Sequence, residues 1–215
     1  MPTATLMPTL TLTVTDRPRV EALRTWWDVR QADPECALAF ADNAPQHFTE
    51  LRTRIDTGAY IFYLVYDEAG EVAGAMWLHD IQHDPDGTPH TGWVGAYVCP
   101  ASRQTGLATA MWHQVRARLE ARGVRHFFAA VHIANTRSQA YATRHMGLHF
   151  VQRFARFTRF GGVLTDCLIY TLHPEDAAAA WAAAHARAHQ QRLCNTASVQ
   201  TADCERREPY FHMII

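Results

Sequence analysis

A loop of small residues between an extended segment and a helix is the part of this sequence best suited to chemistry. Residues 94–110 read VGAYVCPASRQTGLATA, in which Pro100 ends the extended segment and Arg103-x-x-Gly106-x-Ala108 leads into an amphipathic helix. Small side chains let consecutive backbone N–H groups approach a ligand, and the positive end of the helix dipole adds to those donors. The loop predicts a phosphate or pyrophosphate site, to which Arg103 adds positive charge.

This pattern alone is short enough to arise by chance. Two better-known phosphate loops are absent from the sequence, since it contains no GxxxxGK[ST] and no GxGxxG after a strand. The elements around the loop must therefore decide whether it binds phosphate.

A second group of polar side chains, between His79 and His90, resembles a set of metal ligands. On an extended strand, His79 and His83 would lie about 13 Å apart, at about 3.3 Å per residue, too far to share one ion. Asp84-Pro-Asp86-Gly87 also lacks the spacing of a calcium loop. We therefore expect no metal site.

Hydrophobic periodicity and turn residues divide the chain into alternating strands and helices. Asp16 is placed to cap the first helix, with Pro18 in its first turn. The order is one strand, two helices, three strands, helix, strand, helix and two strands, which predicts a mixed α/β sheet. We expect strands at residues 10–15, 60–66, 72–81, 92–98, 126–133, 150–160 and 163–172, and helices at residues 16–33, 44–56, 106–122 and 137–146.

Length and composition favour one globular domain. The 215 residues, 48% of them hydrophobic and 19% charged, suffice for one buried core. We expect this domain to span residues 1–173, and residues 174–215 to form an alanine-rich helix and tail that is an appendage. The apolar end of this tail and its helix offer surfaces for a possible homodimer.

Charge and cysteine usage exclude several classes of protein. A formal net charge of −1 provides no overall field for nucleic-acid binding. The five cysteines are scattered, which indicates neither a disulfide framework nor a zinc site. No apolar segment is long enough for a signal peptide or a membrane span. We expect a reduced, cytoplasmic protein that contacts no membrane.

In its order of elements and its motifs, the sequence resembles the GNAT superfamily of acyltransferases across residues 60–160. Members carry a Val-x-Pro-like strand end followed by [RQ]-x-x-G-x-[GA], and here Val98-Cys99-Pro100 precedes the Arg103–Ala108 loop. Further on they carry an Asn, a Ser or Ala, an aromatic residue and a Gly-aromatic step. The matching residues are Asn135, Ser138, Tyr141, Gly147 and Phe150.

The resemblance implies a GNAT fold, with a mixed sheet of about seven strands flanked by about four helices. It also implies an acetyl-CoA-dependent N-acetyltransferase that acts on a primary amine of a small molecule or peptide, by direct attack in a ternary complex. Backbone groups of Tyr97, Val98 and Cys99 would bind the pantetheine arm, and one of these N–H groups would polarise the thioester carbonyl. The pyrophosphate would lie on the N–H groups of Gln104, Thr105, Gly106, Leu107, Ala108 and Thr109.

The same resemblance places Asn135 and Ser138 beside the pantetheine and makes Tyr141 the proton donor to the departing thiolate. Tyr141 lies six residues before Gly147, where members usually have four, so the helix is expected to be extended or bulged. Attack through a Cys99 thioester is a weaker alternative.

The sequence does not identify the base that deprotonates the amine. Members often have a Glu on the strand before the loop, but residues 92–98 contain no carboxylate. His79 and Asp80 on the preceding strand, His90, or a water chain could serve instead. Trp26, Trp27 and Trp93 are candidates for acceptor contacts, although large aromatics most often belong to the core.

Two other functions remain compatible with the sequence. One keeps the fold but uses a longer acyl donor or another acceptor, such as a nucleobase amine. The other is a degenerate module that binds coenzyme A, or nothing, as a sensor or assembly element. The shifted tyrosine and the missing glutamate keep this second alternative open.

Overall fold

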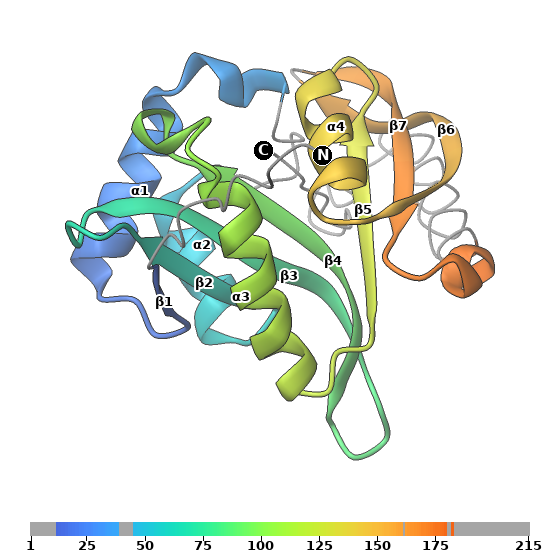
Figure 1. Ribbon diagram of the computed structural model, residues 1–215, viewed down its shortest axis with the longest axis horizontal. Helices are drawn as coiled ribbons and strands as arrows, with labels where there is room; N and C mark the ends of the chain where they lie inside the picture. Colours follow the sequence, from blue (N-terminus) through green and yellow to red (C-terminus); the bar gives the residue numbers. More distant parts are fainter. Residues whose placement is uncertain (1–11, 39–44, 161, 180–181, 183–215) are drawn as a thin grey trace, which may run out of the picture.

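A seven-stranded mixed sheet forms the centre of the described chain (Figure 1). The computed structural model describes residues 12–38, 45–160, 162–179 and 182. The strand order is β1-β2-β3-β4-β5-β7-β6, and only β4 and β5 pair in parallel within this region. The strands are β1 Thr13–Thr15, β2 Tyr60–Tyr66, β3 Val72–His83, β4 Pro89–Val98, β5 His126–His132, β6 His149–Phe160 and β7 Val163–Thr171.

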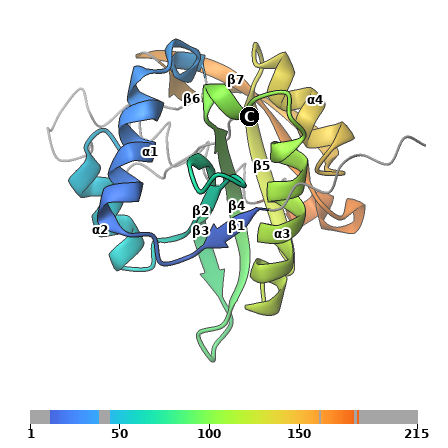
Figure 2. The ribbon, with the colours of Figure 1, turned by 60° about the vertical axis from the view of Figure 1, so that its left-hand side comes forward.

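Helices cover both faces of the sheet, with α1 and α2 on one face and α3 and α4 on the other (Figure 2). On the first face, Trp26 and Leu51 pack against Trp77 of the sheet. On the second, Met111 and Trp112 of α3 join the largest apolar cluster. The α-helices are α1 Val20–Ala32, α2 Phe48–Asp56, α3 Leu107–Ala121 and α4 Thr136–Arg144, and the short 3-10 helices are η1 Pro34–Leu38, η2 Pro100–Ser102 and η3 Pro174–Asp176.

The two parallel strands diverge halfway along their length (Figure 1). The β4–β5 ladder starts at Thr91↔His126 and ends at Trp93↔Phe128, whereas β4 stays paired with β3 as far as Val98. Among the described residues, the second half of β4 thus has no partner strand on the β5 side.

The predicted order of elements and the mixed α/β sheet are confirmed, and the differences lie at element ends. Asp16 does not cap α1, because the helix begins at Val20 and its N-cap is Arg19. Instead the Asp16 carboxylate lies 3.5 Å from the Arg122 guanidinium. The second helix begins at Phe48. Strand β3 continues to His83 through a bulge in which Asp80 has a φ of 48°.

The expected C-terminal extension lies mostly outside the described residues. Its start is tied to the sheet, since Asp176 Oδ2 of η3 is 2.7 Å from His126 Nδ1 of β5. The predicted helix and tail beyond residue 179 fall outside the described part apart from residue 182, so the division at residue 173 stays a prediction. Among the described helices, none is both long and apolar enough to cross a membrane.

Candidate active site

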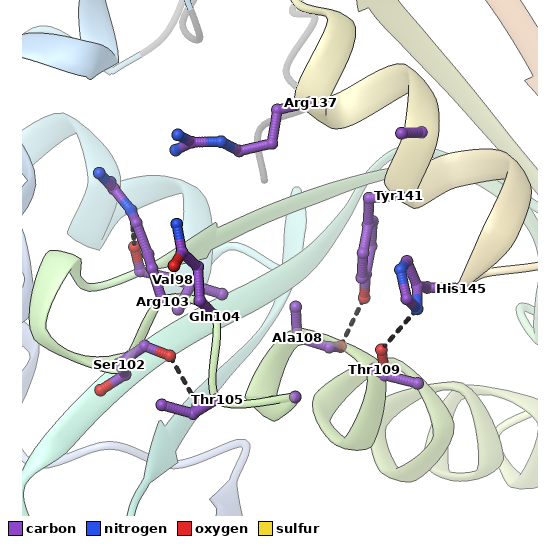
Figure 3. A pocket seen from close by; sticks show the side chains of 12 residues that line it. Val98, Ser102, Arg103, Gln104, Thr105, Ala108, Thr109, Arg137, Tyr141 and His145 are labelled. Atoms are coloured by element: carbon purple, nitrogen blue, oxygen red, sulfur yellow. Dashed lines mark hydrogen bonds between the residues drawn. The ribbon is translucent and has the colours of Figure 1, made fainter.

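A pocket of about 570 Å³ lies at the end of β4, between the first turn of α3 and helix α4 (Figure 3). We call it the α3–α4 pocket. It combines the predicted phosphate loop with one face of α4. Its lining residues are Val98, Ser102, Arg103, Gln104, Thr105, Gly106, Ala108, Thr109, Arg137, Ala140, Tyr141 and His145.

The loop backbone at the start of α3 leaves several N–H groups of pocket-lining residues without an acceptor among the described residues. Gln104 (φ 64°) and Gly106 (φ 84°) both adopt the left-handed conformation, and Gly106 is the N-cap of the helix. Within the described chain, the N–H groups of Gln104, Thr105, Gly106 and Ala108 have no hydrogen-bond acceptor. Unsatisfied N–H groups at a helix start, with the positive end of its dipole, suit an anionic ligand.

The backbone of β4 alternates between its two neighbours. The Cys99 N–H donates to the Ala73 carbonyl of β3, at 2.9 Å. Because hydrogen-bonding direction alternates along an antiparallel ladder, Tyr97 also faces β3, whereas Ala96 and Val98 face the diverging β5. Of the three residues expected to hold a ligand by their backbone, only Val98 faces the opening. Ala96, which was not predicted, faces it too.

Arg103 is held by carboxylates from the end of α1 and from η1. Its Nη2 pairs with Asp33 Oδ2, its Nη1 donates to Glu35 Oε2 at 2.9 Å, and its Nε donates to the Val98 carbonyl at 3.2 Å. The predicted positive charge therefore lies in the α3–α4 pocket but is already shared with two acidic partners. Sequence reasoning did not find these partners, which lie 68 and 70 residues away along the chain.

Asp33 is a buried carboxylate that stays ionised. Burial alone would raise the pKa of Asp33, but hydrogen bonds from Arg103, from the Glu35 N–H and from the Tyr97 hydroxyl outweigh it, and the pKa is lowered. The Tyr97 hydroxyl donates to Asp33 Oδ2 at 2.9 Å. This network joins the end of α1 to β4 and to the phosphate loop.

Arg137 brings a second cation to the α3–α4 pocket from the first turn of α4. Its Nη1 donates to Glu35 Oε2 at 2.6 Å, so Glu35 joins Arg103 and Arg137 (Figure 3 shows the two arginines). Both the Glu35 and Arg137 side chains are more than half exposed, at 55% and 56%. Exposed ion pairs of this kind are weak and open to competition by another anion.

Of the three residues predicted on helix α4 and its N-cap, only Tyr141 is among the described lining of the pocket. Asn135 is its N-cap and accepts a hydrogen bond from the Ser138 N–H at 3.0 Å. Ser138 is fully buried, and neither side chain is among the described lining of the pocket. Tyr141 does line it, and its hydroxyl donates to the Ala108 carbonyl at 2.5 Å. His145, which was not predicted, stacks on Tyr141 with ring centroids 5.7 Å apart.

Burial keeps the tyrosine and cysteine of the site protonated. It raises the pKa of Tyr141 well above its usual range and the pKa of the Cys99 thiol to about 11. A nucleophilic cysteine needs the opposite shift, because the thiolate is the reactive form. The raised pKa of the Cys99 thiol thus gives no support to a covalent route through this residue.

The three candidate bases lie outside the described lining of the α3–α4 pocket. His79 is 1% exposed, pairs with Trp93 in the β3–β4 register, and its Nδ1 lies 3.1 Å from Asp80 Oδ2. His90 is at the start of β4, 3.5 Å from Asp84. Among the described residues, no group of three histidine, cysteine, aspartate or glutamate side chains could hold a metal ion.

The three tryptophans predicted to contact an acceptor are buried core residues in the structure. Trp26 and Trp27 are 2% and 5% exposed and belong to the cluster between the sheet and the first two helices. Trp93 is 2% exposed and packs edge-on against Phe128, with ring centroids 5.6 Å apart. A role in acceptor binding stays a prediction for all three.

Comparison with known proteins gives consistent results. A sequence model of the acetyltransferase (GNAT) family matches residues 21–148. No curated protein sequence matches the chain.

Similar solved structures include RimJ of Mycobacterium smegmatis in complex with a CoA disulfide, at 19% identity and a TM-score of 0.64, covering 83% of this chain and 91% of that one. RimL, a ribosomal-protein alpha-N-acetyltransferase in complex with coenzyme A, has 16% identity and a TM-score of 0.61, covering 77% and 96%. The microcin self-immunity acetyltransferase MccE, in complex with acetyl-CoA and AMP, has 15% identity and a TM-score of 0.59, covering 74% and 91%. At these identities the structural likeness concerns the fold.

Proposed function

The chain belongs to the acetyltransferase (GNAT) family, and from that premise we propose that it transfers the acetyl group of acetyl-CoA to a primary amine of a small molecule or peptide. The reaction we propose is direct attack by the amine in a ternary complex. The observation that carries this proposal is the set of N–H groups without an acceptor in the described chain, on pocket-lining residues at the start of α3 and beside the Arg137 cation of α4.

The residues of the α3–α4 pocket fit the diphosphate of coenzyme A. The diphosphate oxygens would accept hydrogen bonds from the N–H groups of Gln104, Thr105, Gly106 and Ala108. Arg137 would add a positive charge, because its ion pair with Glu35 is exposed to solvent. Acetyl-CoA supplies an acetyl thioester, an electrophile with a thiol leaving group.

The protein contributes hydrogen bonds and one proton. The backbone of Val98 and Ala96, on the unpaired side of β4, would hold the pantetheine arm and orient the thioester carbonyl. Tyr141, kept protonated by burial, would supply a proton to the leaving sulfur. Asn135 and Ser138 would support this arrangement indirectly, by fixing the start of α4.

The acceptor and its base are proposed more broadly. RimL is a ribosomal-protein alpha-N-acetyltransferase and MccE is a microcin self-immunity acetyltransferase, so we keep both peptides and small molecules as acceptors. His79, Asp80 and His90 stay candidates for the base. A water chain is the simplest alternative, because the described part of β4 carries no carboxylate. A cytoplasmic location and a homodimer also remain predictions.

Gly106→Glu tests the phosphate loop. Calorimetric titration with acetyl-CoA should show binding to the wild type and none to the variant, because the new carboxylate faces the phosphates and a side chain is strained at a φ of 84°. Gly58→Glu is the matched control, since Gly58 also has a positive φ (76°), no atom of the described chain within 4 Å of an added Cβ, and a place outside the described lining of the pocket. Unchanged affinity in Gly106→Glu would count against this loop.

Turnover distinguishes the enzyme from a sensor. Release of free thiol from acetyl-CoA, measured against a panel of peptides and small amines, should identify an acceptor. Binding without turnover across a broad panel would favour a module that only senses coenzyme A.

A further inference from the structure

The inner end of the opening between β4 and β5 is bounded by aromatic side chains. The β4–β5 ladder closes at the pair Trp93↔Phe128, and beyond it Val94, Ala96 and Val98 have backbone groups on the unpaired side. A chain-like ligand that enters from the α3–α4 pocket at Val98 therefore has its far end along residues 94–96. Gly95 lies in the middle of this stretch.

Gly95 is a glycine because an indole ring occupies the place of its side chain. A Cβ added at Gly95 would lie 2.3 to 2.5 Å from three atoms of the Trp77 indole, closer than any real contact. Trp77 thus covers the Gly95 backbone on the α1–α2 face of the sheet. On the α3 face, the stretch carries its own side chains, Val94 and Ala96, within the larger core cluster.

The Trp77 ring is held firmly in this position. It stacks on Phe62 with ring centroids 5.8 Å apart and an interplanar angle of 13°. The Trp26 ring meets it edge-on at 6.1 Å. Trp77 is only 2% exposed, so it cannot swing out into solvent without breaking this aromatic cluster.

We propose that Trp77, lying against Gly95, restricts the acyl donor of this protein to short chains such as acetyl. The inference rests on the proposed function, because it takes acetyl-CoA as the ligand of the opening. A longer acyl group would need space beside Gly95, and the indole fills it. A smaller side chain at position 77 opens that space while leaving the phosphate loop unchanged.

The test compares binding of acetyl-CoA, butyryl-CoA and hexanoyl-CoA by calorimetry, which requires no acceptor. The wild type should bind butyryl-CoA at least about tenfold more weakly than acetyl-CoA, the discrimination that a filled apolar pocket gives per added carbon group. We define the ratio as the Kd for butyryl-CoA divided by the Kd for acetyl-CoA. Trp77→Leu should lower this ratio by about tenfold, mainly by strengthening the binding of butyryl-CoA. Trp77→Phe, a smaller change that preserves an aromatic core, should shift the ratio in the same direction.

Trp112→Leu is the control, since Trp112 is equally buried but belongs to α3 and the opposite core cluster. It should leave the butyryl-to-acetyl ratio unchanged. An unchanged ratio in both Trp77 variants, with acetyl-CoA still bound, would overturn the inference and leave the proposed function intact. Equal binding of acetyl-CoA and butyryl-CoA by the wild type would overturn it as well. Failure of the wild type to bind acetyl-CoA at all would instead remove the proposed function, and this inference with it.

Discussion

At the scale of single residues, Glu35 sets how much positive charge the α3–α4 pocket offers to a ligand. Its carboxylate accepts hydrogen bonds from Arg103 and Arg137, which reach it from the phosphate loop and from α4. Any phosphate that enters the pocket must share these two guanidinium groups with Glu35. The carboxylate is 55% exposed, so its hold on them is modest.

Glu35→Gln should therefore strengthen binding of coenzyme A. We expect a gain of about two- to fivefold, which is what the loss of an exposed competing charge is worth. The gain should be largest at low ionic strength, where exposed charges are least screened. Calorimetric titrations at two salt concentrations measure both effects.

Glu120→Gln is the matched control for this variant. It removes the same charge from an exposed ion pair, with Arg116 at 2.7 Å, in the second half of α3. If Glu35→Gln weakened binding instead, Glu35 would be needed to position the two arginines.

In the proposed reaction, Tyr141 is the residue that would supply a proton to the leaving sulfur. A tyrosine hydroxyl is protonated at neutral pH, and burial, which raises the pKa of Tyr141, keeps it so, as the proposed donor role requires. Tyr141→Phe should lower kcat by on the order of 100-fold, the range of general acid catalysis, with a smaller change in KM for acetyl-CoA. Steady-state kinetics with an amine found in the panel measures both constants.

Tyr170→Phe serves as the control, because Tyr170 is a buried tyrosine of β7 that does not line the pocket. Should Tyr141→Phe raise KM and leave kcat unchanged, the hydroxyl would serve only to hold the first turn of α3 through the Ala108 carbonyl.

At the scale of elements, local sequence patterns predicted the features whose conformation is set by adjacent residues. The conformation of the predicted phosphate loop could be anticipated because it is built into successive residues, where Gly106 takes a positive φ and α3 follows at once. The irregular end of α4 was also expected from the spacing of Tyr141 and Gly147. The structure shows that the Tyr141 carbonyl accepts from the N–H groups of both His145 and Met146, an irregular helix end in the stretch that is two residues longer than members usually have.

Contacts between distant elements were not predictable in this way. Asp33 and Glu35 reach Arg103 of this loop because the C-terminal end of α1 and η1 lie beside it in the fold, and no periodicity in residues 20–38 indicates this contact. The direction of each backbone N–H in β4 depends on its register with β3, which the sequence of β4 alone does not contain. The orientation of the Ala96 backbone toward the opening was not predicted for this reason.

At the scale of the whole molecule, each side of the opening is held together by partly buried polar contacts. On the α1 side, Asp33 links Tyr97 and Arg103. On the β5–β7 side, His132 links two elements, since its Nδ1 accepts from the Ala134 N–H at 2.9 Å and its Nε2 lies 3.0 Å from Thr165 Oγ1. Each contact requires one protonation state, so acid should loosen the fold from both sides.

His132 and Asp33 lose their contributions to the free energy of unfolding in different pH ranges. Burial lowers the pKa of His132, so the unfolded chain binds a proton more readily than the folded one. Its contribution is present above the unfolded histidine pKa of about 6.5 and is lost as the pH falls below it. The pKa of Asp33 is lowered by its hydrogen bonds despite burial, so its contribution is lost only below about pH 4, the unfolded aspartate value.

His132→Asn isolates the first of these steps. Asparagine keeps an acceptor for the Ala134 N–H but does not titrate, so the variant should lose less free energy of unfolding than the wild type between pH 7 and about 5. Urea unfolding across this range measures the difference, and His113→Asn, at an exposed position on α3, is the control. If both variants followed the wild-type curve, protonation of His132 would not contribute to the acid sensitivity of the fold.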